Sequence, residues 1–254
     1  MNTLRQCNNI CKLQKSGHSF ILTLNQTSRK DEHLLSPTRI DSIREYLVDV
    51  KSQATKGSVL ITTAEGESFC RGFDYRYARE QAGGSDEAYK KHLQDMVDRF
   101  KDVVKDLISL PMPTIAAING YATEAGLMLG LSHDYLTIKP DILSLRAGLL
   151  AREMSLPGYF SALIRSKVGS PLARRSLVLR DLQFDAKEAA KMGVLDLVHE
   201  VGKDTLQVAE GLAEELARKE WNSEVYAEIR KALYPELCKE LGLTSTTMVP
   251  GLGV

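Results

Sequence analysis

The sequence contains little cysteine, with four residues in a chain of 254. This number is too small for the disulfide framework of a secreted protein, so free thiols are expected. Cys7 and Cys11 are separated by three residues, but no second Cys or His pair has a spacing that would complete a tetrahedral metal site. We therefore expect no bound metal.

The chain also lacks an excess of either charge and a long apolar run. Thirty-three Lys and Arg balance thirty-three Asp and Glu, so no basic field would attract nucleic acid or an anionic membrane. The longest apolar stretches, such as residues 127–131, are far shorter than the roughly 20 residues that a membrane-spanning helix needs. The first residues have no apolar run like that of a secretory signal peptide. A soluble protein that binds neither nucleic acid nor membrane is expected.

Strand and helix patterns alternate along the first part of the chain. Alternating apolar residues around Gly17 predict a β-hairpin over residues 11–24. Ser36 and Pro37 provide the cap and first turn of an amphipathic helix that ends near Gly57. Further segments follow in the same manner: a strand over 58–63, a long helix over about 87–110, a strand over 114–118, a short helix over 125–133 and a strand over 135–138. This order predicts an α/β fold.

The last third of the chain has a helical pattern. Two longer helices are expected, roughly over residues 203–219 and 222–241. We therefore divide the chain into a core of residues 1–195 and a C-terminal helical region of residues 196–254, to which we assign a role in oligomerisation.

Three segments resemble motifs of the crotonase, or enoyl-CoA hydratase/isomerase, superfamily. Residues 68–74 (SFCRGFD) resemble its F-S-x-G-x-D loop, residues 113–126 (PTIAAINGYATEAG) resemble its P-x-I-A-A-v-N-G-x-A-x-G-G-G stretch, and residues 184–195 (FDAKEAAKMGVL) resemble its x-A-x-E-A-x-x-x-G-L-V segment. The three occur in the order and at the separation of that superfamily. The resemblance implies a crotonase-type ββα spiral with a helical C-terminal oligomerisation region, assembled as a homotrimer or hexamer.

Four more segments are similar to plant Δ3,Δ2-enoyl-CoA isomerases. They are residues 57–63, 132–135, 159–163 and 221–226. Because Ser132, His133 and Asp134 belong to one of these segments, we interpret them as scaffold and not as a catalytic triad. The resemblance implies an isomerase of lipid metabolism that acts on a coenzyme A thioester, with no metal or other cofactor.

In this superfamily, two main-chain N–H groups hold the thioester oxygen and stabilise an enolate; donors of this kind contribute roughly 3 to 4 kcal/mol each. The resemblance places them at Phe73 and Ala125. The alternative is that Gly72 and the small residues 122–126 only permit tight turns, and Asp74 is expected to brace the first loop. The substrate-binding positions that the resemblance implies are Cys70, Arg71, Gly72, Tyr75, Gly126, Leu149 and Gly158.

The usual acids of the superfamily are missing. Met128, Leu149 and Gly158 occupy the positions at which its members place a catalytic carboxylate, and none of these residues can move a proton. Carboxylates occur instead at Glu124 and Glu153, where the superfamily has small or apolar residues. Either residue is a candidate for a relocated catalytic base. The alternatives are a helix N-terminal cap for Glu124 and a solvated or Arg152-paired surface group for Glu153.

The activity that these observations favour is a Δ3 to Δ2 double-bond shift, by way of an enolate, in an enoyl-CoA or related carbonyl substrate. Two alternatives remain open. One is a cytosolic enzyme of specialised metabolism that acts on a carbonyl compound without coenzyme A, and the other is a non-catalytic homologue that binds an acyl-CoA or a partner. Plant relatives commonly end in an SKL-like peroxisomal signal, whereas this sequence ends in Leu252-Gly253-Val254. A cytoplasmic location is therefore expected.

Overall fold

The computed structural model describes residues 2–5, 9–28, 32–139, 145–195, 197–198 and 203–246. Cys7 and residues 250–254, on which the metal and targeting expectations partly depend, lie outside the described residues. Within the described ranges, no group of three or more His, Cys, Asp or Glu side chains could hold a metal ion. No helix in this part of the chain has the length and apolar character that a membrane crossing requires.

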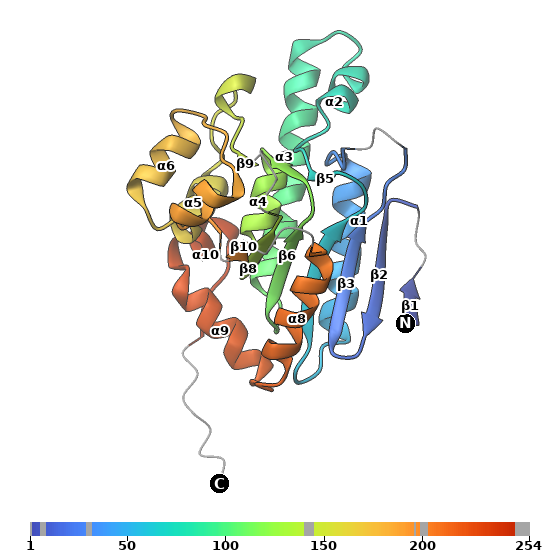
Figure 1. The fold of residues 1–254 in the computed structure, drawn as a ribbon. Helices are drawn as coiled ribbons and strands as arrows, with labels where there is room; N and C mark the ends of the chain where they lie inside the picture. The colour runs from blue at the N-terminus through green and yellow to red at the C-terminus, as the bar shows by residue number, and fades with distance from the viewer. Residues whose placement is uncertain are drawn as a thin grey trace.

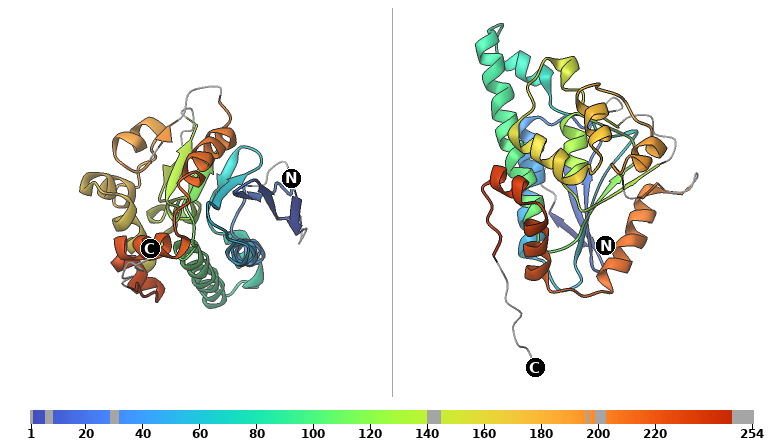
Figure 2. Two further views of the ribbon diagram at one scale, coloured as in Figure 1. Left: turned by 90° about the horizontal axis from the view of Figure 1, so that it is seen from below. Right: turned by 90° about the vertical axis from the view of Figure 1, so that its left-hand side faces the viewer.

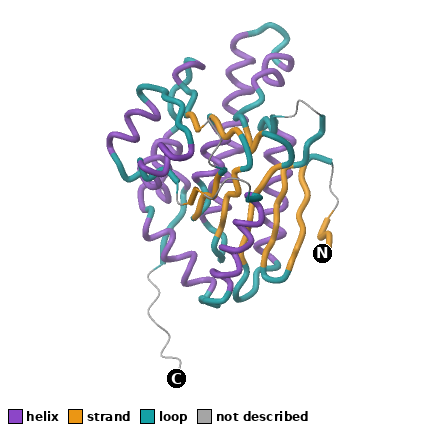
Figure 3. The backbone as a smooth tube through the Cα atoms, viewed as in Figure 1, coloured by secondary structure: helices purple, strands orange, loops and turns teal. Residues whose placement is uncertain are grey.

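A seven-stranded sheet lies at the centre of the molecule, between layers of helices (Figures 1 and 3). Its strands, in spatial order, are β1 (Asn2–Arg5), β2 (Cys11–Ser16), β3 (Ser19–Leu24), β4 (Val59–Ala64), β6 (Thr114–Ile118), β8 (Tyr135–Ile138) and β10 (Leu197–Val198). The predicted hairpin is confirmed as β2 and β3, which pair antiparallel with Ser16 opposite Ser19. From β3 onward the strands are parallel.

A second, smaller sheet was not predicted from the sequence. It consists of the parallel strands β5 (Ser68–Cys70), β7 (Tyr121–Thr123) and β9 (Leu145–Arg146). Along the chain, each of them follows a strand of the large sheet: β5 comes after β4, β7 after β6, and β9 after β8. Each of them is then followed by a helical segment. This repeat is the ββα spiral that the sequence implied.

The helices that follow these strands pack around the two sheets (Figures 1 and 2). After β5 come α2 (Tyr75–Gln81) and α3 (Asp86–Ile108); after β7 comes α4 (Ala125–Leu131); after β9 come the 3-10 turn η1 (Leu150–Arg152), α5 (Gly158–Lys167), α6 (Pro171–Val178) and α7 (Ala186–Lys191). Helix α1 (Pro37–Ser52) packs beside α3, and its predicted Ser36 cap is confirmed by a 3.3 Å hydrogen bond from the Arg39 N–H. This helix ends at Ser52, earlier than expected.

The two faces of the large sheet are covered differently. One face joins the main core with α1 and α3, whereas the other packs against α8 (Thr205–Ala217) through a smaller apolar cluster that includes Ile61, Ile115 and Ala213. Leu60 and Ile61 lie on opposite faces, as the period of a strand requires. Residues 196–254 therefore contribute β10 to the large sheet and α8 to the helix layer that covers one of its faces.

The second helix expected in the C-terminal region is in fact two helices. Pro235 has no N–H to donate and its ring clashes with the carbonyl four residues earlier, so it cannot continue a helix. The chain therefore forms α9 (Ser223–Leu233) and, after Tyr234, α10 (Pro235–Leu241). Helix α10 packs against α3 and α5, and α9 packs against α3.

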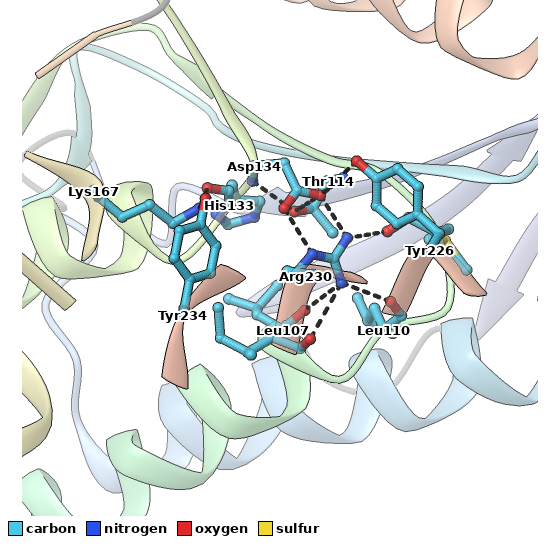
Figure 4. Close-up of polar contacts among 11 residues, drawn as sticks. Leu107, Leu110, Thr114, His133, Asp134, Lys167, Tyr226, Arg230 and Tyr234 are labelled. Atoms are coloured by element: carbon cyan, nitrogen blue, oxygen red, sulfur yellow. Dashed lines mark hydrogen bonds and ion pairs between the residues drawn. The ribbon is translucent and has the colours of Figure 1, made fainter. Parts of the chain in front are cut away.

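A buried polar network fastens α9 to the end of α3 (Figure 4). The Arg230 Nε donates to Asp134 at 2.7 Å. Its Nη1 donates to the Ile108 carbonyl at the end of α3 at 3.3 Å and to the Leu110 carbonyl at 2.7 Å. Burial is the largest single influence on the pKa of Asp134 and would raise it, but the charge and hydrogen bonds of Arg230, the charge of Lys167 and the Thr114 N–H together lower the pKa below its ordinary value. The network thus pairs a buried carboxylate with a guanidinium that also satisfies helix-end carbonyls.

The His133 side chain is part of the same scaffold. One ring nitrogen lies 2.8 Å from the Thr62 hydroxyl, and the other lies 2.9 Å from the Leu129 carbonyl oxygen. Burial lowers the pKa of His133 to about 4. The Ser132 hydroxyl donates to the Met128 carbonyl at 2.7 Å, so these side chains do not form the Ser-to-His hydrogen bond that a triad needs.

Candidate active site

Two loops meet at the carboxyl ends of β5 and β7. These strands are parallel, with Cys70 opposite Ala122, so the segments that follow them leave the small sheet side by side. The Thr123 hydroxyl donates to the Arg71 carbonyl at 3.1 Å and ties the two loops together. Only glycine fits at Gly126, because a Cβ there would overlap the Cys70 carbonyl oxygen.

The first loop leaves the Phe73 N–H outside its hydrogen-bond ladder. Leu35 forms a parallel bridge with Phe73, in which the Leu35 N–H donates to the Gly72 carbonyl at 2.8 Å and the Asp74 N–H donates to the Leu35 carbonyl at 3.3 Å. In this pattern the N–H of the bridged residue itself is not used. The Asp74 carboxylate accepts from the Tyr77 N–H at 2.9 Å and caps α2, so it braces the loop as expected.

The second loop leads directly into α4. Ala125 is the first residue of this helix and is fully buried. The first N–H groups of a helix have no acceptor within the helix. The loop therefore presents an N–H at Ala125 beside the first loop, on the side of the small sheet where β5 and β7 end.

Glu124 has a backbone conformation that strongly favours glycine. Its φ of 54° and ψ of −129° match the first central position of a type II′ turn, which glycine dominates. A glycine on either side makes room for its side chain: a Cβ at Gly72 would lie 2.7 Å from the Glu124 Cβ, and one at Gly148 would lie 2.6 Å from the Cγ. A strained residue held in this way is a reason to look for a function.

The Glu124 carboxylate is held by two donors. The Tyr75 hydroxyl donates to Oε2 at 2.8 Å, and the Arg152 Nε donates to Oε1 at 2.9 Å. Only 9% of the Glu124 side chain is exposed, against 50% of the Arg152 side chain. Although Glu124 occupies the cap position of α4, its carboxylate makes no capping hydrogen bond in the described structure.

Tyr75 and Arg152 also contact each other. The Arg152 guanidinium lies 4.5 Å from the centre of the Tyr75 ring, in a cation–π arrangement. Burial, and then the charge of Glu124, raise the pKa of Tyr75 above its ordinary value. The hydrogen bond to Glu124 raises the pKa of Arg152. The phenol is therefore protonated and the guanidinium charged at neutral pH.

These side chains line a pocket of about 530 Å³, which we call the arginine-lined pocket. Its lining carries four Arg and two Glu, an excess of two positive charges. Three of the arginines form ion pairs, among them Arg71 with Glu32 at 2.9 Å and Arg146 with Asp181 at 2.6 Å. The lining residues are Glu32, Leu34, Arg71, Phe73, Tyr75, Arg76, Tyr121, Thr123, Glu124, Arg146, Gly148, Ala151, Arg152 and Gln183.

The structure brings some of the sequence-predicted site residues to this pocket and places others elsewhere. Arg71, Phe73, Tyr75 and Glu124 line it, Gly72 lies in the first loop beside it, and Ala125 and Gly126 form the start of α4 directly after Glu124. Glu153 is exposed at the end of η1, does not line the pocket and is not the partner of Arg152.

The remaining predicted positions are outside the lining. Cys70 is buried in β5, with its thiol directed at the His33 carbonyl. Leu149 is buried at the start of η1, and Gly158 begins α5 against the Glu240 carboxylate of α10. Met128 is fully buried in α4.

Sequence reasoning missed the pocket roles of Arg146, Gly148 and Gln183. Arg146 ends the short strand β9 and Gly148 follows it, in a segment without a clear periodic pattern, so no local signal identifies them. Gly148 has a φ of 68°, and a glycine in a segment that is otherwise apolar is the one feature that could have drawn attention to it.

Comparison with known proteins agrees with the fold. The family model described as Enoyl-CoA hydratase/isomerase matches residues 21–246. The chain is 43% identical over 240 residues to enoyl-CoA delta isomerase 3 of Arabidopsis thaliana, covering 94% of this chain and 98% of that protein. It is 46% identical over 235 residues to the peroxisomal enoyl-CoA delta isomerase 2 of the same plant, covering 92% and 96%.

Solved structures share the architecture at low sequence identity. An enoyl-CoA hydratase from Mycobacterium marinum superposes with a TM-score of 0.78 at 18% identity, covering 92% of this chain and 95% of that one. An enoyl-CoA isomerase of Mycobacterium tuberculosis gives the same TM-score and coverage at 16% identity. These likenesses support the fold, and the family match and the plant relatives support the membership: the chain belongs to the enoyl-CoA hydratase/isomerase family of the crotonase superfamily.

Proposed function

We propose that this protein shifts a double bond from Δ3 to Δ2 in an enoyl-CoA ester or a related carbonyl compound. The observation that carries the proposal is the nearly buried carboxylate of Glu124, which lies on the wall of the arginine-lined pocket beside the two loops. The relatives named enoyl-CoA delta isomerases, at 36–46% identity, support the same reaction class.

In the proposed reaction, the Phe73 and Ala125 N–H groups hold the thioester oxygen. Donors placed where negative charge develops stabilise the enolate that forms when C2 loses a proton. Glu124 takes that proton, and a proton is then delivered to C4. A positioned carboxylate within hydrogen-bond reach is a common base for such a transfer and contributes typically 10²- to 10⁴-fold in rate.

The charge of the pocket favours an anionic carrier. Three of its four arginines are paired with Glu32, Asp181 and Glu124, whereas Arg76 forms no ion pair among the described residues, so one positive charge of the lining is uncompensated. A guanidinium binds phosphate oxygens through paired N–H groups. Coenzyme A, which carries phosphates, fits this lining better than a neutral carbonyl compound does.

Hydration of the double bond is the less favoured reaction. In hydratase-like relatives it uses two acids, and Met128 and Leu149 replace them here. The same replacements are the reason to keep a non-catalytic acyl-CoA-binding homologue as the second candidate. The homotrimer or hexamer and the cytoplasmic location stay predictions, which light scattering of the purified protein and cell fractionation would test.

The test is to incubate the purified protein with a 3-enoyl-CoA and with the matching pantetheine thioester, which lacks the nucleotide phosphates. The proposal predicts formation of the conjugated 2-enoyl thioester, without the 3-hydroxyacyl product, and a lower KM for the coenzyme A ester. Binding of the ester without turnover would contradict catalysis and favour the non-catalytic homologue. Equal KM values would contradict coenzyme A as the carrier.

A further inference from the structure

The Glu124 carboxylate has little freedom to serve two carbon atoms. Its Oε1 is engaged by Arg152 and its Oε2 by Tyr75, at 2.9 and 2.8 Å. The backbone is strained and the side chain lies between Gly72 and Gly148, with no space for another atom at either glycine. A double-bond shift requires one proton to leave C2 and another to arrive at C4. A carboxylate fixed from both sides is well placed for the first transfer and poorly placed for the second.

The Tyr75 hydroxyl is the neighbouring group that can carry the second proton. Tyr75 begins α2, two residues after Phe73, and its side chain lines the arginine-lined pocket together with Glu124. C2 and C4 of an enoyl chain are separated by only one carbon atom. Two proton carriers at hydrogen-bond distance from each other match that spacing, since each can face one of the two carbons.

Building on the proposed function, we infer that Tyr75 is a second catalytic residue, which donates its hydroxyl proton to C4 while Glu124 accepts the proton from C2. The C2–H bond breaks as an O–H bond forms on Glu124, and the Tyr75 O–H bond breaks as the C4–H bond forms. The resulting phenolate then takes the new proton from Glu124 along their existing hydrogen bond. Both residues return to their starting states, and no oxidant or reductant is needed.

Arg152 has a positioning role in this proton relay between Glu124 and Tyr75. Its Nε fixes the far oxygen of Glu124, and its guanidinium covers the face of the Tyr75 ring. A positive charge over the Tyr75 ring stabilises the transient phenolate during the reaction. The exposed half of the Arg152 side chain also places this charge at the mouth of the pocket.

The relay separates two rates that a single base would keep together. Exchange of the C2 protons with deuterated solvent needs Glu124 only, whereas formation of the 2-enoyl product needs Glu124 and Tyr75. We expect Tyr75→Phe to lower isomerisation by about 100-fold while C2 exchange stays within a few-fold of the unmodified protein. Glu124→Gln should lose both reactions. Phenylalanine keeps the ring on which Arg152 packs, so the pocket is retained.

Tyr77→Phe is the matched control. Tyr77 lies two residues after Tyr75 in the same helix, on a different side of it, and its side chain makes no hydrogen bond among the described residues and does not line the pocket. Both rates should be unchanged in this variant. Mass spectrometry measures the deuterium at C2, and ultraviolet absorbance follows the conjugated thioester.

Three results would overturn the relay. An equal fall of both rates in Tyr75→Phe would show that Tyr75 only positions Glu124, and no fall would show that it is not involved. Deuterium at C4 after a single turnover of C2-deuterated substrate in ordinary water would show direct transfer by one carboxylate. If the unmodified protein performs neither exchange nor isomerisation, the proposed function itself fails, which is a different outcome from a relay that fails alone.

Discussion

The strained backbone of Glu124 predicts an inverted order of stability for its glycine and alanine variants. In most helix and strand positions glycine is the less stable of the two, by about 0.5 to 1 kcal/mol, because it loses more conformational freedom on folding. At φ 54° and ψ −129° a Cβ is unfavourable and glycine is not. We therefore expect Glu124→Gly to be more stable than Glu124→Ala.

The expected difference follows from terms that the two variants do not share. Both lose the hydrogen bond from Tyr75 and the ion pair with Arg152, so these contributions cancel. A non-glycine residue in such a region costs about 1 to 3 kcal/mol. After subtraction of the glycine entropy cost of about 0.5 to 1 kcal/mol, Glu124→Gly should exceed Glu124→Ala by up to about 2.5 kcal/mol in free energy of unfolding, with a central value of about 1 kcal/mol.

Urea unfolding followed by circular dichroism measures this difference. The control is Glu214, an exposed residue inside α8, where glycine should be about 1 kcal/mol less stable than alanine. If Glu124→Ala equals or exceeds Glu124→Gly in stability, the strain argument is refuted. Both Glu124 variants should lack isomerase activity, so any gain in stability would come with a loss of function.

Three further predictions concern the scaffold. Arg230→Met leaves the Asp134 carboxylate without its paired guanidinium and should lower the free energy of unfolding by about 3 to 5 kcal/mol. A loss below about 1 kcal/mol in urea titrations would contradict the importance of this ion pair for stability. In Gly126→Ala the new Cβ would overlap the backbone of β5, so this variant should fail to fold or lose its activity. Gly211 in α8 has open space around it, and Gly211→Ala should raise the free energy of unfolding by about 0.5 to 1 kcal/mol. Thermal melts in which Gly126→Ala is as stable as Gly211→Ala would contradict the close packing at Gly126. The pKa of His133 in the folded protein is about 4, below its ordinary value of about 6.5, so the unfolded chain binds more protons between these two pH values. The free energy of unfolding should therefore fall as the pH drops from about 6.5 to 4, by up to about 1.4 kcal/mol per pH unit. A His133→Gln protein with the same pH profile of stability would disprove this prediction.

Elements with a strong local signal were predictable from the sequence. The hairpin β2–β3 shows the strand period on both sides of a glycine turn, and α1 has a Ser-Pro start before its apolar stripe. The strands β5, β7 and β9 have two or three residues each, too few for any period. They form because parallel neighbours in the spiral bring them together, which is information that no single segment carries.

The candidate site was predictable only in part, for a similar reason. The motifs located both loops and selected Glu124 as a carboxylate at an unusual position. They did not indicate that Arg152, 28 residues further along the chain, turns toward Glu124 instead of the adjacent Glu153. That pairing depends on the η1 turn and on the space left by Gly148, both of which are set by tertiary packing.

The central claim is that Glu124 moves the proton in a double-bond shift. The most direct measurement compares kcat/KM for a 3-enoyl-CoA among the unmodified protein, Glu124→Gln and Glu153→Gln. We predict a fall of about 10²- to 10⁴-fold for Glu124→Gln and no more than a twofold change for the exposed Glu153, about 0.4 kcal/mol in the barrier. A Glu124→Gln protein that retains full activity, or a Glu153→Gln protein that loses it, would contradict this assignment.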